Sequence, residues 1–131
     1  MRTGRSDNAL LSAHKMDREH MTLLAAENDF SAAVDRGASR AELEMRLTLL
    51  IDVFQAHFDS EEGLMAANGF PGLNPHTKEH RNLIEQLTGL RDDLGAGAIN
   101  LCSALSAFVR HWTDEHMQTM DTHFSNFLAQ A

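Results

Sequence analysis

The sequence predicts an all-α fold, an antiparallel up-down-up-down four-helix bundle built as one domain over residues 1–131. Leu and Met dominate the apolar residues, Tyr is absent and β-branched residues are few, a composition that favours helix over strand. The two prolines lie in one short stretch, so long uninterrupted helices fit on either side of it. Apolar residues also recur at steps of three and four, which is typical of a helix with one buried face.

Terminal signals bound the first two helices. A helix over about 8–35 is expected to stop at Gly37, because glycine readily adopts the left-handed backbone that follows a helix C-terminus. The second helix is expected to open at Ser39, where Ser39 and Glu42 form the pattern of a capping box. It should end at the Asn68-Gly69 pair.

The third helix is predicted to open with Asn74 as N-cap and Pro75 in the first helical position, and to end near Gly95. The fourth is predicted to run without interruption over about 98–129. Steps of three and four predict the residues that face the core on the last three helices. They are Leu43, Leu47, Leu50, Phe54, His57, Glu61 and Leu64; His76, His80, Leu83, Leu87, Leu90 and Leu94; and Leu101, Leu105, Phe108, Trp112, His116, Phe124 and Phe127.

Charge and composition exclude several classes of protein. Nineteen acidic residues against eleven basic ones give a formal net charge of −8, which disfavours a nucleic-acid-binding surface. No apolar run is long enough for a membrane span, and the polar residues 1–8 do not resemble a signal peptide. The single cysteine, Cys102, cannot form an internal disulfide. We therefore expect a cytoplasmic protein with no nucleic-acid or membrane partner.

Five histidines and two carboxylates interrupt the predicted core faces of all four helices. A buried carboxylate without a cation or strong hydrogen bonds is costly, and a metal ion supplies that cation. A lone histidine or a single i,i+4 pair would be explained by ordinary core packing or helix stabilisation. Seven such groups together favour a metal site instead. The candidate ligands are His20, His57, Glu61, His76, His80, His116 and Asp121.

The number and type of these ligands point to two metal ions. Imidazole and carboxylate suit iron, zinc, copper or manganese, and seven ligands exceed the needs of one ion. The high share of nitrogen ligands favours reversible oxygen chemistry over oxygen activation, while a structural zinc bundle is the redox-silent alternative. His116 and Asp121 are five residues apart, about 140° around a regular helix, which predicts a local π-turn or a long reach by Asp121.

The sequence resembles the bacterial hemerythrins over about 17–124. All seven ligand positions of that family are filled here, as His20, His57-x-x-x-Glu61, His76-x-x-x-His80 and His116-x-x-x-x-Asp121. Flanking residues match as well, namely Asp17, the His57-Phe58-x-x-Glu61-Glu62 stretch, Met65, the Gly69-Phe70-Pro71 turn and Trp112.

The resemblance implies a hemerythrin-like bundle around a non-haem di-iron centre with a bridging oxo or hydroxo group. By that likeness three histidines, His76, His80 and His116, bind one iron. The other iron, bound by His20 and His57, keeps an open position for dioxygen. Glu61 and Asp121 bridge the two.

By the same likeness, Leu23, Phe58, Trp112, Thr113 and Met117 form the oxygen pocket over the open iron. The family usually carries a bulky apolar residue at the position of Thr113 and a β-branched one at that of Met117. We expect a wetter pocket and a shorter-lived oxygen adduct, so that Thr113→Leu should slow autoxidation.

A non-enzymatic protein that binds dioxygen reversibly, as carrier, store or scavenger, is the function that this likeness implies. An oxygen- or redox-sensing module acting on a partner protein is one alternative. A di-iron protein that handles peroxide or nitric oxide is another. No general acid or base stands out beside the predicted ligands.

Overall fold

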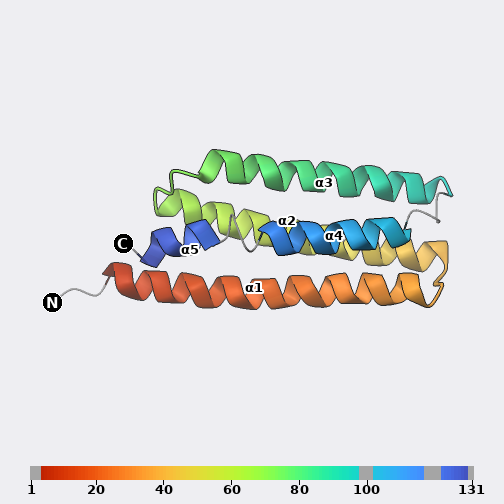
Figure 1. The fold of residues 1–131 in the computed structure, drawn as a ribbon, viewed down its shortest axis with the longest axis horizontal. Helices are drawn as coiled ribbons and strands as arrows, with labels where there is room; N and C mark the ends of the chain where they lie inside the picture. Colours follow the sequence, from red (N-terminus) through yellow and green to blue (C-terminus); the bar gives the residue numbers. More distant parts are fainter. Residues whose placement is uncertain (1–3, 98–101, 117–121, 130–131) are drawn as a thin grey trace.

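The computed structural model describes residues 4–97, 102–116 and 122–129 of the chain, and these residues form five helices. They are α1 (Gly4–Asp35), α2 (Arg40–Ala67), α3 (Leu73–Gly95), α4 (Cys102–His116) and α5 (Thr122–Ala129). Successive long helices run in opposite directions, and α5 continues the direction of α4 (Figure 1). The predicted up-down-up-down bundle is therefore confirmed, with the two termini at the same end.

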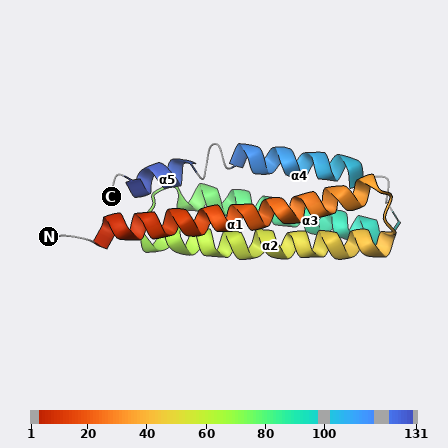
Figure 2. The ribbon, with the colours of Figure 1, turned by 90° about the horizontal axis from the view of Figure 1, so that it is seen from below.

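Helix α1 has a central place in the packing. It contacts α2, α4 and α5, while α3 packs chiefly against α2. Seen from the perpendicular direction, α4 and α5 lie over one side of α1 and α2 lies on the other (Figure 2). Of the helices described, none combines the length and the apolar character that crossing a membrane would require.

The predicted boundary between α1 and α2 is confirmed in detail. Gly37 adopts a left-handed φ of 69°, and the Ser39 hydroxyl accepts a hydrogen bond from the Glu42 amide at 3.2 Å. The Glu42 carboxylate binds the Arg36 guanidinium, so this side chain links the end of α1 to the first turn of α2. Gly69, with φ 65°, follows α2 as expected.

The predicted start of α3 is wrong by two residues. The helix begins at Leu73, and Gly72 rather than Asn74 occupies the N-cap, without a side-chain hydrogen bond. A Cβ at Gly72 would lie 2.7 Å from the Phe70 ring, so glycine lets the chain pass close beneath that ring. Pro75 still lies in the first turn, where its missing N–H breaks no helical hydrogen bond.

Within the range predicted for the fourth helix, the structure describes α4 (Cys102–His116) and α5 (Thr122–Ala129), and the predicted continuity across 117–121 lies outside the described residues. The π-turn expected between His116 and Asp121 and the core position Leu101 lie outside the described residues. α5 packs at the end of the bundle, where Phe70 contacts Phe124 and Phe127 with ring centroids 5.1 and 5.2 Å apart.

Most predicted core residues of the long helices are buried, including Leu47, Leu50 and Phe54 at 0% exposure. The prediction for Phe108 is wrong, because its side chain is 37% exposed and Val109 is buried in its place. Leu64 is likewise only half-buried, and its neighbour Met65 takes the interior position. In both cases the buried face advances by four residues, from Glu61 to Met65 and from Leu105 to Val109, where the pattern predicted a step of three.

Candidate metal centre

The structure brings six of the seven predicted ligands together inside the bundle. Their candidate ligand atoms form two groups, and within each group all atoms lie within 4.8 Å of one another. The seventh predicted ligand, Asp121, lies outside the described residues. The first group comprises Glu61, His76, His80 and His116, and the second comprises His20, His57 and Glu61.

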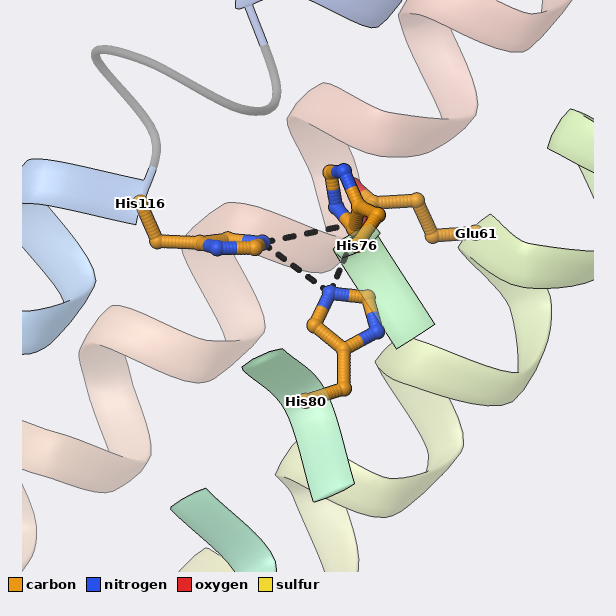
Figure 3. Close-up of side chains that lie close together, drawn as sticks. All are labelled: Glu61, His76, His80 and His116. Atoms are coloured by element: carbon orange, nitrogen blue, oxygen red, sulfur yellow. Dashed lines mark hydrogen bonds and ion pairs between the residues drawn. The ribbon is translucent and has the colours of Figure 1, made fainter. Parts of the chain in front are cut away.

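Glu61 belongs to both groups and is completely buried. Its Oε1 lies 2.5 Å from Nε2 of His76, 3.1 Å from Nε2 of His80 and 3.7 Å from Nε2 of His116 (Figure 3). Its Oε2 lies 3.6 Å from Nε2 of His57. One carboxylate therefore presents a different oxygen atom to each group of histidines.

Helical spacing explains how so few elements supply so many donors. His57 and Glu61 are four residues apart on α2, and so are His76 and His80 on α3, so each pair projects from one face of its helix. The rings of His20 and His57 meet edge to face at 4.8 Å between centroids. Each of the four long helices therefore contributes to the cluster.

A second set of carboxylates binds the outer nitrogen atoms of three histidines. Nδ1 of His57 lies 2.8 Å from Glu19, and Nδ1 of His80 lies 2.8 Å from Glu62. Nδ1 of His116 lies 3.3 Å from Glu79. The Ser60 hydroxyl donates to the other oxygen of Glu19 at 2.8 Å and holds it in place.

These contacts decide which ring nitrogen carries the proton. An ionised carboxylate only accepts hydrogen bonds, so Nδ1 of each of these histidines donates its proton outward. The neutral ring then directs the lone pair of Nε2 toward the centre of the bundle. Metal-binding histidines are oriented by carboxylates in this way.

The inner nitrogen atoms show that the cluster suits a metal. Nε2 of His80 and Nε2 of His116 lie 3.0 Å apart, within hydrogen-bond distance. Because both rings already donate from Nδ1, this contact requires either an added proton, which makes one ring cationic, or a metal ion bound to both nitrogen atoms. Nε2 of His57 is buried and makes no hydrogen bond to any residue in the described part of the chain. The donor set of imidazole and carboxylate is one that iron, zinc, copper and manganese all accept.

Aromatic rings enclose the cluster on the side of α4. Phe58 stacks on His80 with ring centroids 3.8 Å apart, and Trp112 stacks on His116 at 4.5 Å. Among the predicted pocket residues, Leu23, Phe58 and Thr113 are at most 2% exposed and Trp112 is half-buried. Met117 lies outside the described residues. The surroundings are therefore largely apolar, with Thr113 as the polar exception.

Sequence reasoning missed the outer carboxylates and one further acid. Glu19 precedes His20, Glu62 follows Glu61 and Glu79 precedes His80, so an acidic residue adjoining a predicted ligand was the available signal. Glu27 lies seven residues after His20, two turns further along the buried face of α1, and is only 5% exposed.

Burial raises the pKa of Glu27 from 4.5 to about 7, so a titratable acid does lie inside the bundle near the predicted pocket. Glu27 interacts with Thr113 and lies two helical turns from His20, so the prediction that no general acid or base stands out beside the ligands themselves stays a prediction.

Comparison with known proteins agrees with the geometry of the cluster. The family model described as the hemerythrin HHE cation binding domain matches residues 11–128. The bacteriohemerythrin of Methylococcus capsulatus is 30% identical over 105 residues, which cover 80% of this chain and 79% of that protein. Myohemerythrin-1 of Phascolopsis gouldii is 29% identical over 106 residues, 81% of this chain and 77% of that protein.

A myohemerythrin from Sipunculus nudus is 32% identical over 76 residues, 58% of each chain. No solved structure gives a significant match. The family model covers most of the described bundle and all the helices that carry the cluster. Since the family model spans residues 11–128 and the bacteriohemerythrin is 30% identical over 80% of this chain, the chain belongs to the hemerythrin family.

Proposed function

We propose that this protein holds two iron ions and binds dioxygen reversibly at one of them, as a carrier, store or scavenger. His76, His80 and His116 would bind the first iron, and His20 and His57 the second. Glu61 would bridge the two through its separate oxygen atoms, with a hydroxide beside it. Asp121 would supply the second bridge, an assignment that rests on its place in the sequence pattern.

The single observation that carries the proposal is that Glu61 belongs to both groups of candidate ligand atoms. A carboxylate with one oxygen facing three histidines and the other facing a fourth supports two ions rather than one. With the second bridging carboxylate and a hydroxide, it would offset most of the charge of two ferrous ions, which makes their burial less costly.

The unequal number of histidines supports a binding site on one side only. The group around His76 offers three imidazoles, whereas the group around His20 offers two. Two ferrous ions in these positions would supply electrons reversibly to dioxygen. The protein contributes a largely apolar enclosure, because Leu23 and Phe58 are buried. Such an enclosure admits apolar dioxygen and excludes water and anions.

Iron content and an optical spectrum test the proposal together. Protein loaded with iron should contain two ions per chain. After reduction without air, a visible absorption band should appear on adding oxygen, fade on removing it and return on readmission. Two irons per chain without a reversible absorption band would support the di-iron site but contradict reversible oxygen binding. Zinc in place of iron, with no optical response, would contradict both the di-iron site and oxygen binding.

Peroxide or nitric oxide handling is the second candidate, and the buried hydroxyl of Thr113 favours it. A polar side chain in the enclosure can hydrogen-bond a polar ligand that an apolar wall would reject. Rapid, irreversible oxidation of the reduced protein by air, together with turnover of added peroxide, would support this second function over the first.

A further inference from the structure

Glu27 is a buried carboxyl group that takes no part in the proposed iron coordination. It lies on α1 between Leu23 and Phe30, which are 2% and 1% exposed, and it is itself 5% exposed. Seven residues separate it from His20, about 10 Å along the helix axis. His20, Leu23 and Glu27 follow steps of three and four, which places them on one face of α1.

Thr113 faces Glu27 from α4 and is 1% exposed. Oε2 of Glu27 and Oγ1 of Thr113 are both buried. The two side chains approach each other closely enough for the Thr113 hydroxyl to lower the pKa of Glu27, but neither of these atoms makes a hydrogen bond to a third described residue. Unsatisfied buried polar atoms are rare in proteins and usually indicate a ligand, a water or a chemical role. Two of them side by side mark a place for a small polar partner.

The charges around Glu27 favour a neutral carboxyl group near pH 7. Burial raises its pKa to about 7 and the nearby Asp114 adds to this, while the Thr113 hydroxyl and Arg110 act in the opposite direction. From α2, the titratable residues on the buried face are His57 and Glu61, both within the metal cluster. α5 lies beside the opposite end of α1 (Figure 2).

We propose that Glu27 and Thr113 form a proton-donating pair beside the oxygen pocket, which protonates reduced dioxygen and promotes its release as hydrogen peroxide. The inference rests on the proposed function, since it needs two ferrous ions and dioxygen. In the step, two ferrous ions are each oxidised by one electron. Dioxygen takes both electrons and two protons and leaves as hydrogen peroxide.

Glu27 supplies one of these protons by way of the Thr113 hydroxyl, and solvent water supplies the other. The glutamate then recovers its proton from solvent. The pair would therefore limit how long the protein retains dioxygen, and retention would depend on the protonation of one side chain. The proposal explains why position 113 carries Thr in place of the usual apolar residue. The Thr113 hydroxyl would connect the carboxyl group of Glu27 to the oxygen pocket.

The test compares autoxidation of the iron-loaded, reduced protein in air with that of Glu27→Gln. The native rate should rise as the pH falls through about 7, following protonation of Glu27. Glu27→Gln should slow the rate at pH 6 by roughly tenfold, at the modest end of general acid catalysis, and flatten its pH dependence. Thr113→Val should slow it similarly, whereas Thr113→Ser, which keeps the hydroxyl, should stay within about twofold of native.

Asp29→Asn is the matched control, because Asp29 is an exposed acid close to Glu27 on α1 and the substitution likewise replaces a carboxylate with an amide. It should leave the autoxidation rate unchanged. An independent readout is the infrared carbonyl band of a protonated carboxylic acid in metal-free protein. It should be present at pH 6, fade above pH 7 and be missing from Glu27→Gln. An unchanged autoxidation rate in Glu27→Gln that still binds iron and oxygen would overturn the proposal.

Two further outcomes separate this inference from the proposed function. If Glu27→Gln fails to fold, the comparison of Thr113→Val with Thr113→Ser tests the proposal instead. Equal autoxidation rates in these two variants would overturn the proposed proton-donating pair. If the native protein binds no iron or releases no peroxide, the proposed function or the step fails whatever the infrared band shows. Absence of that band from native protein at pH 6 would overturn the role of Glu27 alone.

Discussion

The Nε2 atoms of His80 and His116 lie 3.0 Å apart, although the two residues come from different helices and each presents its other nitrogen to a carboxylate. Glu62 and Glu79 fix the direction in which the two rings donate. The contact between the two Nε2 atoms then requires a positive charge, either an added proton shared by the rings or a metal ion bound to both. The cluster is thus arranged for a positive charge before any ion binds.

Removing the shared carboxylate should uncouple the two proposed ions. Glu61→Ala is expected to lower the iron content from two per chain to one or fewer, because both groups lose an oxygen ligand. Elemental analysis of desalted protein measures this. Asp59→Asn, an exposed acid on the same helix, should leave the iron content unchanged. Two irons retained in Glu61→Ala would contradict the bridging role.

The carboxylates that contact the Nδ1 atoms of the histidines should affect the affinity for iron, although they are not themselves ligands. Glu62→Gln is expected to weaken iron binding by roughly 10–100-fold, because the amide no longer holds the proton of His80 on Nδ1. Glu79→Gln should have a smaller effect, since its contact with His116 is longer, 3.3 Å against 2.8 Å, and Glu79 is 41% exposed. Competition with a chelator of known affinity ranks the two variants. The reverse order would argue against orientation by these carboxylates.

Glu27 should make the stability of the metal-free protein depend on pH. Its pKa is about 7 in the folded state against an ordinary value of 4.5, so between these values the unfolded chain ionises while the folded one does not. The native free energy of unfolding should therefore fall as the pH rises from about 4.5 to about 7, by at most about 3 kcal/mol. Above that window the loss is complete.

Urea unfolding of native protein and Glu27→Gln at pH 5, 6, 7 and 8 checks this linkage. As the pH rises from 5 to 8, the free energy of unfolding of native protein should fall relative to that of Glu27→Gln, because glutamine does not ionise. Because the two proteins differ only at residue 27, the comparison isolates the contribution of that side chain. A difference that stays constant with pH would mean that Glu27 ionises normally in the folded protein.

Two phenylalanines provide a paired test of the core. Phe54→Ala should lower the free energy of unfolding by about 3–5 kcal/mol, because Phe54 is 0% exposed and contacts both Phe58 and Trp112. Phe108→Ala should cost much less, since Phe108 is 37% exposed. Chemical denaturation of both variants measures the difference. Similar losses would indicate that Phe108 is covered in solution.

The sequence predicted the helices and most of the site because both depend on short-range spacing. Pairs four residues apart share a helical face whatever the rest of the chain does, so His57 with Glu61 and His76 with His80 could be recognised directly. The Ser39 cap and the Gly37 stop are equally local. Boundaries were less predictable: α3 opens at Leu73, directly after Gly72, which lies close beneath the Phe70 ring. That ring packs against Phe124 and Phe127 of α5, contacts between distant parts of the chain that no local pattern records.

By itself, then, the sequence determined which residues can bind a metal and on which helical faces they lie. Only the tertiary structure decided which oxygen of Glu61 faces which histidines, and that Glu19, Glu62 and Glu79 orient the rings. It also decided that Glu27 is buried opposite Thr113. The reason is physical: periodicity defines a face, but distances between faces and the solvation of a carboxyl group depend on how separate helices pack.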